Sequence, residues 1–465
     1  MKKNKLLLLL KSFTKAEISA FRKYIRSDYF TRREDYRHLF EALLLQLTSK
    51  QALDKQQLFQ KAYPLETFND LKLRAALSDL KAQLEKFLVI QQVLEEDTEN
   101  NIRLLEIFNE RKLGYAFQQK LKKVETTLAK TSKQDLNYFQ QKLRTQQLKA
   151  TLLASQKRTA DLPLQEISEQ IDINFMIEKL RHACSQLTHQ LVYKTQYDFG
   201  LLKNVLLILE RGQFLHIPAI RIRYYCFQFL SHPEEKEFFD QFRDLLFAQE
   251  AQFERKELKD LYLLGINFCI RQLNQGNTFY PQELWKLYQQ GLAADVFLDD
   301  GRLSRFTFNN VIGIGINLKE FTWLDHFVEQ YKNYLAEEDK DSIIYFNQAR
   351  VIYHAKKDHE AVIQLLQKVN FKDIVENLMS KTMLSKVYYE LKEFDLLDYH
   401  LTSFQQYIRR HKLGKYHTTN YNNIILLLRK LLNVFAYDKA QKQKLRTEIL
   451  ETEVLTEREW LLEQL

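Results

Sequence analysis

The chain has 465 residues, of which 45% are hydrophobic, enough for a large core and too many for a disordered chain. It contains 32 Phe and 24 Tyr but only 10 Gly and 5 Pro, too few turn-forming residues for a sheet protein of this size. The net charge of +9 is uneven, because residues 1–162 carry +12 and residues 163–465 carry −3. Such asymmetry can mark a face for nucleic acid or for an acidic partner, although the charges are mixed and form no long run.

The first residues superficially resemble a secretory leader, with Lys2, Lys3 and Lys5 before an apolar run. That run, Leu6 to Leu10, is shorter than the roughly 7–15 residues of a secretory h-region. No stretch approaches the roughly 20 apolar residues of a membrane span. The cysteines, Cys184, Cys226 and Cys269, are odd in number and form no CxxC pair, which favours buried thiols in a reducing compartment. We therefore expect a cytoplasmic protein without a membrane partner.

Helical patterns then follow one another along the chain. Thr14 and Glu17 have the spacing of a capping box, which predicts a helix start. Apolar residues recur at helical spacing and predict buried faces formed by Ile18, Phe21, Tyr24 and Ile25; by Leu39, Phe40, Leu43, Leu44 and Leu47; by Leu73, Leu77, Leu80, Leu84 and Phe87; by Leu104, Ile107 and Phe108; and by Phe117, Leu121, Val124 and Leu128. The segment between Pro218 and Ser231 is apolar on most sides and predicts a central buried helix.

These patterns predict an all-α protein, an array of antiparallel helix pairs with a small basic N-terminal helical module. No strand-and-turn rhythm and no alternation of strands with helices interrupts the helical patterns. The acidic stretch at residues 95–101 is the best candidate boundary. We expect the basic module at residues 1–95, a helical array at 96–300, and repeats with C-terminal capping helices at 301–465.

An internal repeat occupies the C-terminal third. The segment Tyr353 to Ala361 aligns with Tyr389 to Leu397 at an offset of 36 residues, and a weaker copy, Ile316 to Leu324, lies 37 residues before the first. Each copy has an apolar or aromatic residue near the end of one helix, a short polar turn, and a small or apolar residue in the next helix. Because one helix pair cannot bury both of its faces, such copies must stack on their neighbours.

This pattern resembles the tetratricopeptide repeat over about residues 301–411. Three positions depart from the family pattern, since Lys319, Lys356 and Lys392 stand where the family usually has glycine; the family's tryptophan and closing proline are also missing. The resemblance implies stacked helical hairpins with a surface that holds a peptide or a partner's helix, and it implies no catalytic residues. More loosely, the whole chain resembles helical-repeat proteins common in Bacteroidota, a likeness that carries no mechanism.

Patterns for catalysis, cofactors and metals give no site. Gly313 and Gly315 supply two glycines of a phosphate-binding loop, but no convincing strand precedes them, so we expect them to permit close helix contact. His182, Cys184 and His189 lie on one predicted helix without a second ligand pair, which favours a surface or half-buried histidine pair over zinc. We therefore expect no catalytic residue, no cofactor and no metal.

One basic cluster has some functional interest. It comprises Arg22, Lys23, Arg26, Arg32, Arg33 and Arg37, interleaved with Phe21, Tyr24, Tyr29 and Phe30. The cations could contact phosphates or an acidic partner, and the aromatic rings could stack on bases. The alternative is that the rings form the core of a small module and the cations form its solvated face.

The leading hypothesis from the sequence is a non-enzymatic scaffold that binds a protein or peptide partner on a helical-repeat surface. The alternative is a nucleic-acid-associated regulator that uses the basic N-terminal module, with contacts within residues 1–162.

Overall fold

The structure, a computed structural model, describes residues 5–31, 33–48, 54–95, 97–156, 159–193, 195–338, 340–434 and 438–465. In these ranges the only strands are the two-residue β1 (Leu298–Asp299) and β2 (Arg302–Leu303), paired antiparallel. The predicted all-α helical array is confirmed. The chain forms two compact units, Met1–Met176 and Ile177–Leu465, and the division falls within α9 (Leu164–Tyr193). None of the described helices combines the length and apolar character needed to cross a membrane.

The first unit begins with a hydrophobic core built by five helices, α1 (Lys5–Lys11), α2 (Lys15–Tyr24), α3 (Glu34–Thr48), α4 (Lys55–Ala62) and α5 (Asp70–Glu95). Leu6 and Leu10 are buried in this core, so the leader-like apolar run is part of the fold. The predicted capping box is confirmed, because the Glu17 amide donates to Thr14 Oγ1 at 3.1 Å and the Thr14 amide donates to Glu17 Oε2 at 2.6 Å.

A second core of the same unit is built by α6 (Asp97–Glu110), α7 (Gly114–Lys130) and α8 (Leu136–Gln156). The predicted face of α7 is confirmed as buried. The predicted face of α6 is confirmed only at Phe108, which packs against this core, whereas Ile107 is exposed and Ile102 and Leu105 are buried instead. Ile102, Leu105 and Phe108 follow a three-residue spacing, a second apolar face on the same helix, and this face meets α7. The predicted boundary at residue 95 falls between the two cores.

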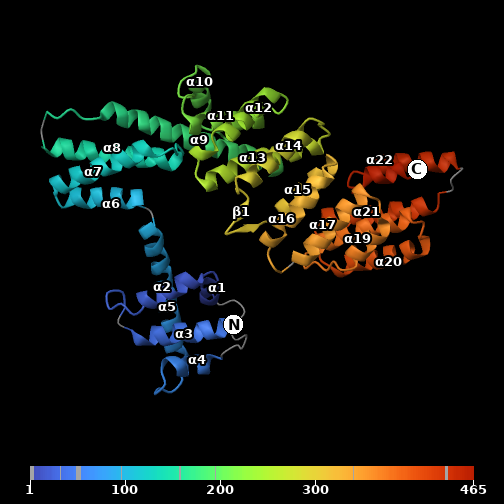
Figure 1. Ribbon diagram of the computed structural model, residues 1–465, viewed down its shortest axis with the longest axis horizontal. Coiled ribbons are helices and arrows are strands. Elements are labelled where there is room, and N and C mark those ends of the chain that lie inside the picture. Colours follow the sequence, from blue (N-terminus) through green and yellow to red (C-terminus); the bar gives the residue numbers. More distant parts are fainter. Residues whose placement is uncertain are drawn as a thin grey trace. The chain divides into compact units, whose positions relative to one another are not determined.

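The second unit continues as helices, and consecutive helices after the first of them pack against one another (Figure 1). They are α10 (Leu202–Glu210), α11 (Pro218–Ser231), α12 (Lys236–Ala248), α13 (Arg255–Asn274), α14 (Tyr280–Ala293), α15 (Arg305–Asn317), α16 (Phe321–Tyr331), α17 (Lys340–Ala355), α18 (His359–Leu366), α19 (Ile374–Glu390), α20 (Phe394–Arg410), α21 (Lys415–Leu432), α22 (Lys439–Glu451) and α23 (Arg458–Glu463), with short 3₁₀ turns at Glu250–Gln252 and Lys332–Tyr334. The predicted buried helix is α11, and all three cysteines are free and buried, as expected.

The three repeat copies become the hairpins α15–α16, α17–α18 and α19–α20, and their register corrects the sequence alignment. The left-handed residues at the turns are Lys319, Lys357 and Lys392, with φ of 62°, 52° and 61°. Lys356, the residue aligned from the sequence, is therefore displaced by one position. The residue of α18 that matches the buried Leu324 and Leu397 is correspondingly Val362, not Ala361. The sequence alignment assumed a nearly constant repeat length and so could not locate these turns, because their left-handed residues are 38 and then 35 residues apart.

Gly315 lies in the middle of α15 and permits the close helix contact that the sequence predicts. A Cβ atom at this position would stand 2.6 Å from Leu324 Cδ2 on α16. Carbon atoms in contact are normally about 3.5–4.0 Å apart. The hairpin can therefore close this tightly only with glycine at position 315.

Candidate functional site

Three members of the predicted basic cluster of the first unit, Arg22, Arg33 and Arg37, make internal contacts. Arg22 makes two parallel bonds to Glu41, from Nε to Oε1 at 2.6 Å and from Nη2 to Oε2 at 2.9 Å. Arg33 pairs with Asp35, at 2.6 Å, and with Asp79, at 3.3 Å. These arginines join α2 to α3 and the start of α3 to α5. They are partly exposed, so each pair is worth at most about 1 kcal/mol.

The remaining members of the cluster divide between structural and exposed positions. Arg37 donates to the backbone carbonyls of Ile25 and Arg26, each at 3.2 Å, and so holds the end of α2. The Lys23 and Arg26 side chains are exposed. Arg32 lies outside the described residues. Of the interleaved aromatics, Phe21 and Tyr24 are buried in the core, Phe30 stacks on Tyr24, and Tyr29 is 88% exposed.

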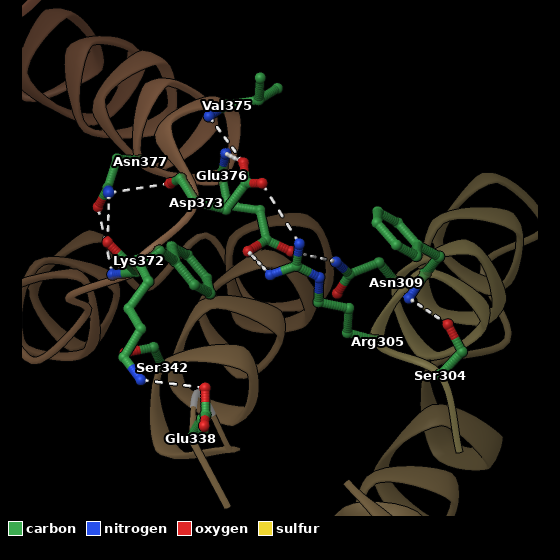
Figure 2. Close-up of polar contacts among 12 residues, drawn as sticks. Ser304, Arg305, Asn309, Glu338, Ser342, Lys372, Asp373, Val375, Glu376 and Asn377 are labelled. Atoms are coloured by element: carbon green, nitrogen blue, oxygen red, sulfur yellow. Dashed lines mark hydrogen bonds and ion pairs between the residues drawn. The ribbon is translucent and has the colours of Figure 1, made fainter. Parts of the chain in front are cut away.

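A different polar constellation runs along the first helices of the three repeat hairpins. Figure 2 shows Arg305, at the start of α15, reaching the N-terminal turn of α19. There its guanidinium meets Glu376 at 3.1 Å and Asp373 at 3.3 Å. Asp373 also caps α19 by accepting from the amides of Val375 and Glu376, a favourable place for a carboxylate. This arginine therefore ties the first hairpin to the third.

Two asparagines continue this polar row. Asn347 on α17 is fully buried; its Nδ2 donates to Asn309 Oδ1 on α15 at 2.6 Å and to the Ile343 carbonyl at 2.8 Å. Arg350, one turn further along α17, donates from Nη1 to Asn347 Oδ1 at 3.0 Å and to the Asn309 carbonyl at 3.3 Å. Buried polar groups are costly without hydrogen-bond partners, so this row of hydrogen bonds fixes the position of each hairpin relative to the next.

The row ends at a cleft formed by α17, α19 and the chain's last residues. An open cavity of about 650 Å³ is lined by Tyr353, His354, Lys357, Lys386, Glu390, Glu457, Arg458, Glu459, Trp460 and Glu463. A deeper cavity of about 170 Å³ adjoins it and is lined by Arg350, Tyr353, His354, Met379, Thr382, Met383, Lys386, Tyr421, Thr456 and Glu457. The two cavities share four lining residues. We call them together the cleft, and the smaller one the deep cavity.

Glu390 fixes the wall of the cleft. Its Oε1 accepts from the Tyr353 hydroxyl and, at 2.6 Å, from Trp460 Nε1, and its Oε2 lies 2.6 Å from His359 Nε2. Burial alone would raise the pKa of Glu390, but the hydrogen bonds from Tyr353, His359 and Trp460 outweigh it and lower the pKa. Burial, reinforced by the bond to Glu390, raises the pKa of Tyr353, so its hydroxyl stays protonated. Glu390 therefore serves as an ionised acceptor that joins α17, α18, α19 and α23.

The deep cavity brings basic side chains together. Lys386 is 6% exposed, and its Nζ pairs with Glu457 Oε2 at 2.7 Å. The same Nζ lies 4.9 Å from the Tyr353 ring centroid and 5.5 Å from that of Trp460, within reach of both aromatic faces. Burial lowers the pKa of Arg350 to about 10, so this guanidinium is still charged at neutral pH.

His354 lines both cavities and remains open to solvent on the cleft side. Loss of solvation by the surrounding protein is the largest cause that lowers the pKa of His354 to about 4, and the positive charges of Lys386 and Arg350 lower it further. The imidazole is therefore neutral at physiological pH. It presents a polar, uncharged edge to the cleft.

These cleft residues were not singled out from the sequence, except for Tyr353 as a repeat aromatic. One signal was available, because Arg350 and Lys386 lie 36 residues apart, close to the repeat spacing, and so occupy similar faces of successive first helices. No local signal indicates the closing segment, since Glu457 and Trp460 return to the cleft from about 70 residues further along the chain.

The other candidate positions give no site. His182 and His189 are exposed, whereas Cys184 between them is buried, so the three side chains do not converge. Across the ranges that the structure describes, no group of three or more His, Cys, Asp or Glu side chains is arranged to hold a metal ion. Comparisons of the chain with protein-family models, curated proteins and solved structures found no match.

Proposed function

We propose that the chain is a non-enzymatic interaction scaffold, and that the cleft of its second unit binds a segment of a partner protein. The observation that carries this proposal is the cleft itself, which is open, is lined by charged and aromatic side chains, and is built on packed helices. Aromatic and cationic side chains at the centre of a pocket are the groups that dominate binding energy in protein interfaces.

The chemistry of the cleft supports binding rather than catalysis. Glu390 already hydrogen-bonds to three side chains and so is poorly placed to accept a proton from a substrate. Tyr353 is held protonated by that same carboxylate, and His354 is a weak base at neutral pH because its pKa is lowered to about 4. What these groups offer a ligand is charge, hydrogen bonding and aromatic surface.

The test is affinity purification of the full-length, tagged chain from its native host after nuclease treatment. His354→Trp places a large ring in the cleft, and Lys356→Trp places the same ring on an exposed site just beyond the end of α17, outside the cleft lining. We expect Lys356→Trp to retain the captured partner and His354→Trp to weaken its binding by about thirtyfold or more, because blocking an interface hot spot costs about 2 kcal/mol or more.

Two results would contradict the proposal. Equal capture by the two variants would place the partner elsewhere on the chain. Loss of every captured protein on nuclease treatment would show that nucleic acid was the bridge, and the basic residues within 1–162 would then become the functional site. Nucleic-acid binding through these residues remains a prediction, and the internal pairing of Arg22, Arg33 and Arg37 gives it little support.

A further inference from the structure

The deep cavity holds more positive than negative charge. Arg350 and Lys386 both line it, and Glu457 is its one lining carboxylate among the described residues. The larger cavity, by contrast, is lined by four carboxylates and three cations, because His354 is neutral. The excess of positive charge is therefore confined to the deep cavity. Its volume is about 170 Å³. A single water occupies about 30 Å³ in the liquid, so the cavity is large enough to hold a carboxylate group.

Arg350 is the less satisfied of the two cations. Its Nη1 donates to a backbone carbonyl and to an amide oxygen, both of which are neutral. Within the described part of the chain, no carboxylate lies within ion-pair distance of its guanidinium. The Glu457 carboxylate acts on Arg350 only through space, by opposing the effect of burial on the arginine. A charge that is crowded by protein and has only neutral partners gains strongly from an added anion.

Glu457 is a resident carboxylate held in an unusual backbone conformation. Its φ of 57° lies in the left-handed region, which L residues other than Asn, Asp and Gly enter at a cost of about 1 kcal/mol or more. It stands between α22 and α23, and its side chain reaches Lys386 on α19, 71 residues away in sequence. This ion pair shows that a carboxylate fits beside Lys386.

From this geometry we propose that the deep cavity is a carboxylate-binding site for an acidic segment of a partner, and that Glu457 is its internal competitor. An Asp or Glu side chain of the partner enters between Arg350 and Lys386. It takes the lysine from Glu457, whose own carboxylate moves toward solvent. This inference rests on the proposed function and adds the chemistry by which the cleft selects a partner.

The test measures binding of fluorescein-labelled hexaglutamate to the full-length chain by fluorescence anisotropy, with hexaglutamine as the uncharged probe. Glu457→Gln removes the competing charge at the deep cavity. Glu459→Gln is the matched control, because it makes the same charge change two residues away at an exposed position that lines only the larger cavity. We expect Glu457→Gln to tighten hexaglutamate binding about tenfold, because the positive charge of Lys386 is then free to interact with the ligand. Glu459→Gln should change binding less than about twofold, because its charge is solvent-screened.

A third variant, Arg350→Met, should weaken hexaglutamate binding about tenfold. If that variant fails to fold by circular dichroism, the two glutamate variants still decide the matter. Equal binding of hexaglutamate and hexaglutamine, or the same effect from both glutamate variants, would overturn the carboxylate site. Inorganic phosphate that displaces hexaglutamate fully at equimolar concentration would also overturn it, since the site would then recognise a free anion.

The experiments distinguish failure of the carboxylate site from failure of the proposed scaffold function. If His354→Trp abolishes partner capture while the two glutamate variants behave alike, the scaffold function stands and the carboxylate selection fails. If His354→Trp and Lys356→Trp capture the same partner equally, the scaffold function fails at this cleft whatever the peptide result.

Discussion

Replacing Gly315 by Ala should weaken the α15–α16 hairpin, although alanine is the better helix former. The added Cβ would stand 2.6 Å from Leu324 Cδ2 and 2.9 Å from Leu324 Cγ. That is a shortfall of about 1 Å against ordinary carbon contacts. Leu324 is fully buried, so its side chain has little room to withdraw.

The magnitude follows from two opposing effects. Alanine in a helix interior is favoured over glycine by about 1 kcal/mol. Forcing an extra methyl group into a packed core costs about 1–3 kcal/mol, and here the overlap involves two atoms of one buried side chain. Gly315→Ala should therefore lose up to about 2 kcal/mol of stability. Gly313→Ala is the control on the same helix, where the new Cβ would meet only the flexible Arg350 Nη2 at 3.2 Å, so it should be neutral or slightly stabilising.

Urea unfolding followed by tryptophan fluorescence suits this comparison. Trp323 lies on α16 and packs edge-on against Trp285 on α14, with ring centroids 4.6 Å apart, so this pair reports on the hairpin. A double variant with Leu324→Ala should remove the clash and make the Gly315 change favourable. The reasoning is refuted if Gly315→Ala and Gly313→Ala have the same midpoint, or if the double variant shows no coupling.

Two other variants test the turns and the cleft wall. Lys392→Gly should raise stability by about 0.5–1 kcal/mol in urea unfolding, because glycine relieves the left-handed backbone, whereas Lys392→Val should lower it. Glu390→Gln should cost about 1–3 kcal/mol at pH 7, because the Tyr353, His359 and Trp460 side chains lose a charged acceptor. Since the pKa of Glu390 is lowered by folding, its stabilising effect is present above the unfolded pKa of about 4.3 and disappears as pH falls through the lower folded value. The difference between wild type and variant should therefore shrink in urea titrations at pH 3, and a constant difference would contradict this role.

Local patterns predicted the elements well. The Thr14–Glu17 capping box forms as expected, because both partners lie within one helical turn. The Pro218–Ser231 segment is the buried helix α11, although its Ile and Tyr residues also favour strands. In both places the information that decides the structure is carried by neighbouring residues.

Prediction failed where two local solutions compete. In α6 two apolar faces share Phe108, and packing with α7 and α8 buries the one that also contains Ile102 and Leu105. In the repeats, a change of spacing from 38 to 35 residues moved the middle left-handed residue to Lys357. A lysine in that conformation gives no sequence signal, whereas a glycine would have marked the turn.

The candidate site was less accessible to sequence reasoning. The basic cluster near residue 30 was selected by composition, but composition does not show that Arg22 and Arg33 are paired with Glu41 and Asp35. The cleft depends on Glu457 and Trp460 returning to α19 from far along the chain. Such long-range contacts require the stacked hairpins, which exist only once the fold has formed.

The most direct test of the central claim is photo-crosslinking in the native host from the cleft itself. A photoreactive phenylalanine analogue is introduced at His354 or, as the control, at Lys356, in the full-length chain, and products are analysed after nuclease treatment. The scaffold function predicts a discrete crosslinked protein from position 354 and none, or far less, from position 356. The same products from both positions, or no protein product from position 354, would contradict a partner-binding cleft.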